Sequence, residues 1–140
     1  MIETIRNIAA TIALMLALAS PAFGQGRPVG STLVTASATG TTGATTATLP
    51  AAPGLTTYMC GFSIDANATA AIAGNATVTG TVSGTLNFTQ PVGATPAVGT
   101  VNRIFNPCVP GNAINTAIAV NSIAPGTAGV VSVTAWGFQN

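Results

Sequence analysis

The chain has 140 residues, of which three are Lys or Arg, two are Asp or Glu and none is His. Charged residues make up 4% of the sequence, against about 25% in an ordinary soluble domain. Phosphate binding needs a patch of basic side chains, so this composition excludes nucleic acid as a partner. Disordered chains are poor in hydrophobic residues, whereas this one is 48% hydrophobic, so we expect a folded domain.

Residues 1–24 have the layout of a secretory signal peptide. Arg6 precedes an apolar run at 8–19, and the small residues Ala22 and Gly24 follow at positions that favour cleavage after residue 24. The run has about 12 residues, fewer than the roughly 20 that a membrane-spanning helix needs. A membrane anchor or a buried helix is the alternative. We therefore expect cleavage, a product without a membrane span, and a secreted, periplasmic or cell-surface location.

Residues 25–55 are of low complexity and rich in Gly, Ala, Ser and Thr. Within them, only STLVTASA (31–38) and TTATL (45–49) have the composition of strands. An extended arm or linker that becomes ordered against a neighbour is an equally good interpretation. The expected organisation is thus a signal peptide at 1–24, an arm or linker at 25–55, and a β-sandwich domain at 56–140.

The stretch TTYMCGFSID at 56–65 alternates between two faces, as the side chains of a β-strand do. Tyr58, Cys60 and Phe62 share one face, and Met59 lies on the other. Because the first face carries the larger apolar groups, we expect it to point into the core.

Residues 75–89 show the clearest alternation, with apolar residues or Gly at even positions and Asn, Thr or Ser at odd positions. A single strand of about 50 Å would exceed the usual length, so we expect a turn. A three-residue loop at 82–84 preserves the parity of the alternation and places Thr81 opposite Thr85. The pattern predicts core positions for Val78, Leu86 and Phe88, and solvent or partner positions for Thr77, Thr79 and Asn87.

Further strands are expected at 98–105, 112–122 and 129–138. The last has apolar residues on both faces, which indicates an interior strand or one covered by another subunit. No helical periodicity of useful length follows residue 24. About seven to nine short strands separated by turns predict an all-β fold, namely a single antiparallel β-sandwich or jelly-roll.

Cys60 and Cys108 are the only cysteines, so their pairing is unambiguous if the chain reaches an oxidising compartment. Cys108 lies between Pro107 and Pro110, where a regular strand is disfavoured. We therefore predict a disulfide bond that ties a rigid corner to the core. Metal binding would need more ligands, and a catalytic dithiol would favour a closer spacing. Two buried free thiols would follow if the leader were retained.

No group of residues predicts catalysis, because acid–base chemistry usually draws on His, Glu, Asp or Lys and only Asp65 follows the leader. We expect no enzymatic activity, no cofactor and no metal site. Asp65 is expected to cap a turn and Arg103 to form an ion pair with it, with a partner-facing Arg103 as the alternative. Trp136 is a second possible partner-facing residue. With Phe138 and Tyr58 it would form a sugar-binding platform, although core packing is the preferred interpretation.

The segments CGFSI, SGTLNFTQ, FNPCVP, NTAIAV and AWGFQ lie within residues 56–140. Together they resemble a group of small β-sandwich proteins from alphaproteobacteria and their phages or prophages. These motifs are signatures of turns and strands. The resemblance therefore implies a shared fold and display on a particle or a cell surface, and it assigns no catalytic residue.

The preferred functional hypothesis is a secreted or surface-displayed structural or interaction module without catalysis. We expect it to form a homo-oligomer or to dock on a larger assembly, because so few charges leave little repulsion between copies. Residues 25–54 would contribute by strand addition to a neighbour. A phage virion decoration or fibre-type protein that keeps its leader is the alternative, and a carbohydrate-binding module is the second alternative.

Overall fold

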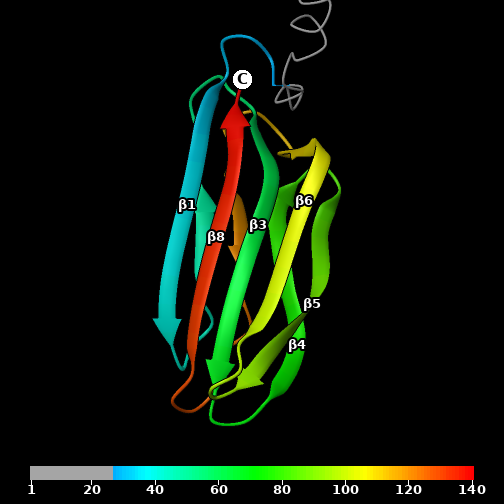
Figure 1. The fold of residues 1–140 in the computed structure, drawn as a ribbon. Coiled ribbons are helices and arrows are strands. Elements are labelled where there is room, and N and C mark those ends of the chain that lie inside the picture. Colours follow the sequence, from blue (N-terminus) through cyan, green and yellow to red (C-terminus); the bar gives the residue numbers. More distant parts are fainter. Residues whose placement is uncertain (1–26) are drawn as a thin grey trace, which may run out of the picture.

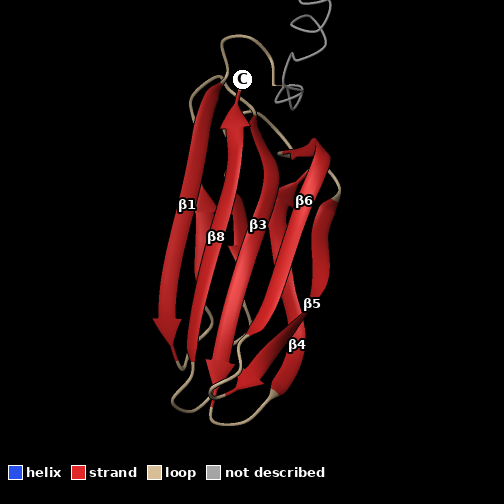
Figure 2. Cartoon of the chain, viewed as in Figure 1, coloured by secondary structure: helices blue, strands red, loops and turns tan. Residues whose placement is uncertain are grey.

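The computed structural model describes residues 27–140, and the signal peptide expected at 1–24 lies outside them. The described residues form eight β-strands and contain no helix (Figure 2). The strands are β1 (Thr32–Thr41), β2 (Thr46–Leu49), β3 (Thr57–Ala68), β4 (Ile72–Thr81), β5 (Gly84–Ala94), β6 (Gly99–Pro110), β7 (Ile118–Asn121) and β8 (Val130–Gln139). The predicted all-β class is confirmed.

The strands form two facing layers (Figure 1). The front sheet has the order β1-β8-β3-β6, and the back sheet has the order β2-β7-β4-β5. β1 pairs antiparallel with β8, β2 with β7, β3 with β6, and β4 with β5. The strand pairs are therefore nested around the central β4–β5 hairpin. This strand order is that of a jelly-roll. The end of β3 also pairs in parallel with the end of β5, which joins the two sheets at that edge.

Residues 25–55 contribute two strands to the sandwich. β1 pairs along its whole length with β8, beginning with Thr32 opposite Gln139. β2 pairs with β7, and its Leu49 is fully buried in the core. The sandwich therefore begins at β1 rather than at residue 56, because the partners of this segment lie in its own chain.

The core lies between the inner faces of the two sheets. Along β8, Val131, Val133 and Ala135 are fully buried, while Trp136 lies on the opposite face. β8 is an interior strand between β1 and β3, as its apolar character on both faces indicated. Burying a Val or Leu side chain stabilises the fold by about 1.5–3 kcal/mol, so these inner rows supply most of the stabilising free energy.

The β4–β5 hairpin differs from the loop expected at 82–84. Thr81 pairs with Gly84, so its turn consists of the two residues between them. Parity is preserved instead by a bulge in β4, where the register shifts between Val78 and Thr81. Gly80 lies in this bulge with φ 83°, a left-handed conformation that glycine adopts without steric cost.

The two faces of this hairpin follow the predicted alternation. Val78 is fully buried, and Leu86 and Phe88 pack against the core. On the outer face, Asn87 is exposed and Thr77 is half-buried beside β7, where its hydroxyl accepts a hydrogen bond from the Asn121 side chain. The bulge keeps the apolar positions on the inner side of both strands.

Candidate interaction surface

The regular pairing of β3 is interrupted at Cys60. Between Met59 and Gly61 the register shifts against both neighbouring strands. A bulge adds one residue to a strand, and the alternation of faces changes where it occurs. Met59 therefore lies in the core with Phe62, while Tyr58 and Cys60 are half-buried on the outer side of the front sheet. The expectation that Tyr58 and Cys60 share the core face of Phe62 is corrected by this bulge.

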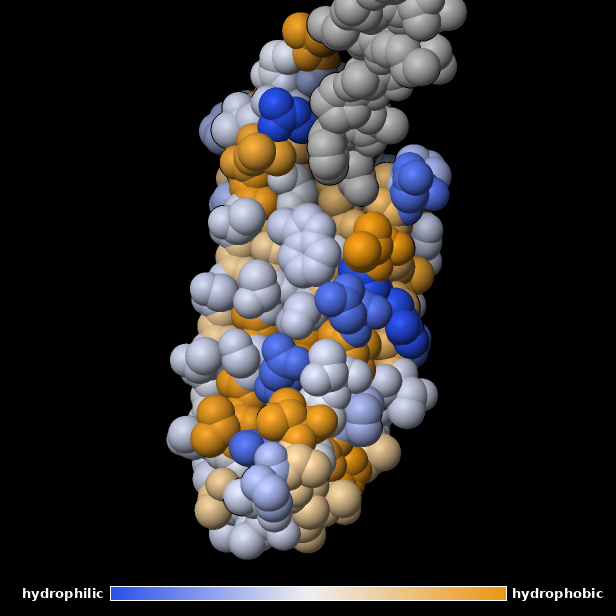
Figure 3. Space-filling view, viewed as in Figure 1, coloured by the Kyte–Doolittle hydropathy of each residue, from blue (hydrophilic) through white to orange (hydrophobic). Residues whose placement is uncertain are grey.

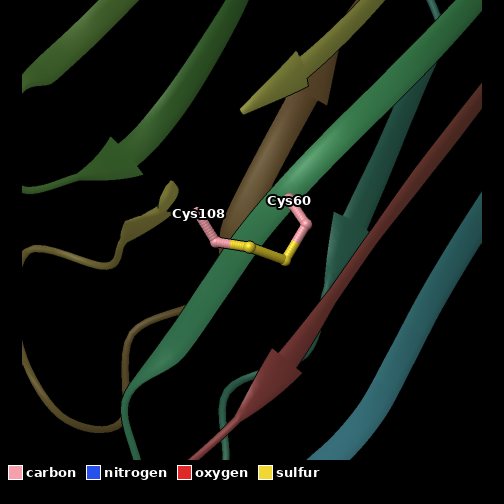
Figure 4. The surroundings of a disulfide bond; sticks show 2 residues. All are labelled: Cys60 and Cys108. Atoms are coloured by element: carbon pink, nitrogen blue, oxygen red, sulfur yellow. A yellow bond between two sulfur atoms is a disulfide. The ribbon is translucent and has the colours of Figure 1, made fainter. Parts of the chain in front are cut away.

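The interruption is larger in β6, where residues 105–108 are left out of the pairing with β3. The Cys60–Cys108 disulfide bridges this stretch (Figure 4), with the two sulfur atoms 2.03 Å apart and the two Cα atoms 4.3 Å apart. The predicted disulfide is confirmed. Cys108 lies within β6 rather than after its end, and the covalent bond joins β3 to β6 where the backbone ladder is broken.

Trp136 lies beside the disulfide on the outer face of β8. It pairs with Gly61, and a Cβ atom on Gly61 would stand 2.5 Å from Cζ2 of the indole. The absent side chain thus makes room for the ring against the sheet. Farther along the same face, the rings of Tyr58 and Phe138 stack with their centroids 4.7 Å apart and their planes 13° from parallel. The expectation of core packing is confirmed for Phe138, which is buried, and is corrected for Trp136 and Tyr58, which are half-buried on the outer face of the front sheet.

The three rings and the disulfide line a groove of about 690 Å³ on the front sheet, which we call the aromatic groove. Its other lining residues include Arg27, Pro28, Leu33, Thr35 and Asn106. Small-molecule sites in proteins typically occupy about 300–1,000 Å³, so the groove has the size of a binding site. The visible front face of the molecule shows strongly and weakly hydrophilic side chains interspersed with hydrophobic ones (Figure 3).

The aromatic groove combines predicted and unpredicted residues. Trp136 and both cysteines are brought together in it, whereas Arg27, Thr35 and Asn106 carried no signal in the sequence. These three come from the segment before β1, from β1 and from β6. Only the order of strands in the sheet places them at one site, and alternation within single strands does not reveal that order.

Arg103 is not among the residues that line the aromatic groove, although its backbone carbonyl lies close to Gly61. It pairs with Phe62 in register, whereas Asp65 pairs with Thr100. Arg103 lies three positions after Thr100 on β6, an odd spacing, so the Arg103 and Asp65 side chains point to opposite faces of the sheet. The Asp65 carboxylate accepts a hydrogen bond of 2.8 Å from the Thr100 hydroxyl. The expected ion pair is therefore replaced by two separate contacts, and Asp65 lies within β3 rather than at a turn.

The guanidinium of Arg103 contacts an aromatic cluster that closes one edge of the core. Its Cζ lies 5.9 Å from the ring centroid of Phe88, a cation–π geometry. The Phe88 ring in turn lies 5.1 Å from Phe62 and 6.2 Å from Phe105, measured between centroids. Arg103 is exposed, yet it covers this cluster rather than the aromatic groove.

Among residues 27–140, no group of three or more His, Cys, Asp or Glu side chains is arranged to hold a metal ion. Of the side chains that line the aromatic groove, Arg27 and Tyr58 are the ionisable ones, because both cysteines are bonded. No helix within the described part of the chain is long and apolar enough to cross a membrane. The described residues of the aromatic groove offer aromatic faces, the hydroxyls of Thr35 and Tyr58, the amide of Asn106 and one cation, Arg27.

No family model matches the chain, and neither the curated proteins nor the solved structures contain a significant match. The resemblance to small proteins of alphaproteobacteria and their phages therefore stays a prediction. Jelly-rolls occur in proteins of many functions, so the fold does not choose among them.

Proposed function

We propose that this protein is a non-catalytic interaction module, secreted or displayed at a surface, which docks on a larger assembly through the aromatic groove. The observation that carries the proposal is the position of Trp136, half-buried and lying against Gly61 beside the Cys60–Cys108 disulfide. Aromatic residues with one apolar and one polar side are typical of binding surfaces. A disulfide that fixes the wall of the groove lowers the entropy lost on binding.

A carbohydrate chain is the ligand that best fits the chemistry of the groove. Flat indole and phenol rings offer stacking surfaces for the apolar faces of sugar rings. The hydroxyls of Thr35 and Tyr58 and the amide of Asn106 can donate and accept hydrogen bonds with a hydroxylated ligand. Among the described residues, no carboxylate lines the groove, which disfavours a cationic ligand. These features support a neutral or weakly acidic glycan.

Because Trp136 is the single tryptophan, its fluorescence reports directly on the groove. A panel of neutral and acidic glycans is first screened for binding. We expect titration with a polysaccharide that binds to shift the Trp136 emission and to reduce its quenching by acrylamide. Asn106→Ala keeps the fluorophore and is expected to weaken binding, while Asn87→Ala, exposed on β5, serves as the matched control. Unchanged emission with every glycan would reject the carbohydrate ligand. If isolated cell-surface or particle material retains the wild type and the Trp136→Ala variant equally, the docking function is rejected.

The disulfide is compatible with an oxidising, extracellular compartment. Secretion and retention on a virion differ in the fate of residues 1–24. The intact mass of the native protein separates them, because secretion predicts a first residue near Gln25 and a virion protein predicts an intact Met1.

A further inference from the structure

Edge strands present unpaired backbone groups to which another strand can add, and proteins usually block them with charge, Pro, bulges or shortness. Three of the four edges in the described sandwich carry such protection. β6 contains Arg103, Pro107 and Pro110 and has broken pairing, β5 contains Pro91, and β2 has four residues and is followed by Pro50. Each of these strands is a poor template for a further strand.

β1 is different. It is a strand of ten residues, TLVTASATGT, without Pro or charge, and its pairing with β8 is continuous from end to end. Among the described strands, β8 is its only neighbour in the sheet order, so within residues 27–140 its other side is an edge of the front sheet (Figure 1). Val34, Ala36 and Ala38 pack against the core but stay half-buried. The inner row of this edge is thus incompletely covered.

We propose that β1 pairs antiparallel with β1 of a second copy of this chain, which joins the two front sheets into one continuous sheet across a two-fold axis. The strand is self-complementary for this arrangement, because residues directly opposite in a pair lie on the same face. With Ser37 opposite Ser37 of the second copy, Thr35 faces Thr39 on the outer side and Ala36 faces Ala38 on the inner side. Hydroxyl residues then meet hydroxyl residues, and small apolar residues meet each other.

A second copy is favoured over an unrelated strand by symmetry and by charge. The charged side chains of residues 27–140 are Arg27, Asp65 and Arg103, and none of them lies on β1. Two copies therefore approach at this edge without repulsion, and the two-fold axis lets both edges be satisfied at once. Leu33, which is 68% exposed, lies near the end of the same edge. Leu33 and Thr35 also line the aromatic groove, so the edge of β1 borders that groove. The dimer goes beyond the proposed docking function because it is held by backbone pairing along β1 and needs no ligand in the groove.

The test is the molar mass of the full chain by size-exclusion chromatography with light scattering at tens of micromolar. We expect a dimer for the wild type. Ser37→Lys places two ammonium groups opposite each other at the axis and is expected to weaken the dimer about tenfold or more. Thr48→Lys adds the same charge at an exposed position of the other edge strand β2, and is expected to leave the dimer intact.

Far-UV circular dichroism and Trp136 emission verify that both variants are folded. Ser37→Cys adds a positive readout, since oxidation is expected to link two copies into a covalent dimer that reductant separates. A monomeric wild type at these concentrations overturns the proposal. An oligomer that Ser37→Lys leaves unchanged, or that Thr48→Lys disrupts equally, overturns it as well, because another surface would then hold the copies together.

Discussion

The Cys60–Cys108 disulfide should supply a large share of the stability of the sandwich. The two cysteines are 48 residues apart in the sequence, and the chain-entropy model gives about 4 kcal/mol for closing a loop of that length in the unfolded chain. Domains of this size are stable by about 5–15 kcal/mol in total. We therefore expect the double variant Cys60→Ser/Cys108→Ser to lose roughly a quarter or more of its free energy of unfolding.

The same value can be expressed as a melting temperature. Unfolding entropy is about 2.1 cal/mol/K per residue, which gives about 0.24 kcal/mol/K for roughly 110 ordered residues. A loss of about 4 kcal/mol then lowers Tm by about 15–20 °C. The bond also joins β3 and β6 across the break in their pairing, so no backbone ladder remains there to compensate.

Equilibrium unfolding in guanidinium chloride, followed by far-UV circular dichroism, measures this change. Wild-type protein treated with reductant should match the double variant, and reductant should leave the variant itself unaffected. The slope of the transition serves as a check on the structure of the unfolded state. A loss below about 1 kcal/mol would refute the reasoning, because the loop-closure term would then be cancelled by strain or by residual structure.

Two further predictions concern packing on either side of the front sheet. Gly61→Ala introduces a Cβ that would stand 2.5 Å from the Trp136 ring and 2.6 Å from the Arg103 carbonyl oxygen. We expect the free energy of unfolding to fall by about 1–3 kcal/mol and the Trp136 emission to shift. Unchanged emission would show that the ring is not held against Gly61. Leu49→Ala empties a fully buried position on β2 and is expected to cost about 2–5 kcal/mol. The exposed neighbour Thr48→Ala is its control, and equal stability of the two variants would mean that β2 is not part of the core.

The alternation of apolar and polar residues predicted those features of the fold that depend on a single strand or hairpin. The faces of β8 and of the β4–β5 hairpin follow from period-two patterns, and the disulfide follows from there being two cysteines in the chain. The bulges at Cys60 and Gly80 were not predictable in this way, because an extra residue is accommodated by the geometry of the neighbouring strands. Placing Tyr58 in the core and three residues in the hairpin turn were both errors of this kind.

The strands β1 and β2 show a second limit. An edge strand with one solvent-exposed face can be rich in Thr and Ala, which is also the composition of an extended arm. The sequence of residues 25–55 is therefore compatible with an edge strand and with an arm. What decides between them is a partner that lies at the opposite end of the sequence, where Thr32 meets Gln139. The aromatic groove has the same origin, since its walls come from β1, β3, β6 and β8.

The nested strand order has a consequence for the time course of folding. Because β8 separates β1 from β3, neither of those strands can complete its pairing until the final residues of the chain are available. Topologies dominated by such distant pairings fold in about milliseconds to seconds, slowly for their size. During synthesis, β1 is therefore the first of the eight described strands to emerge and remains unpaired longest, and its uncharged sequence is then exposed to other chains. A truncation that removes β8 should leave an aggregation-prone chain rather than a smaller sandwich.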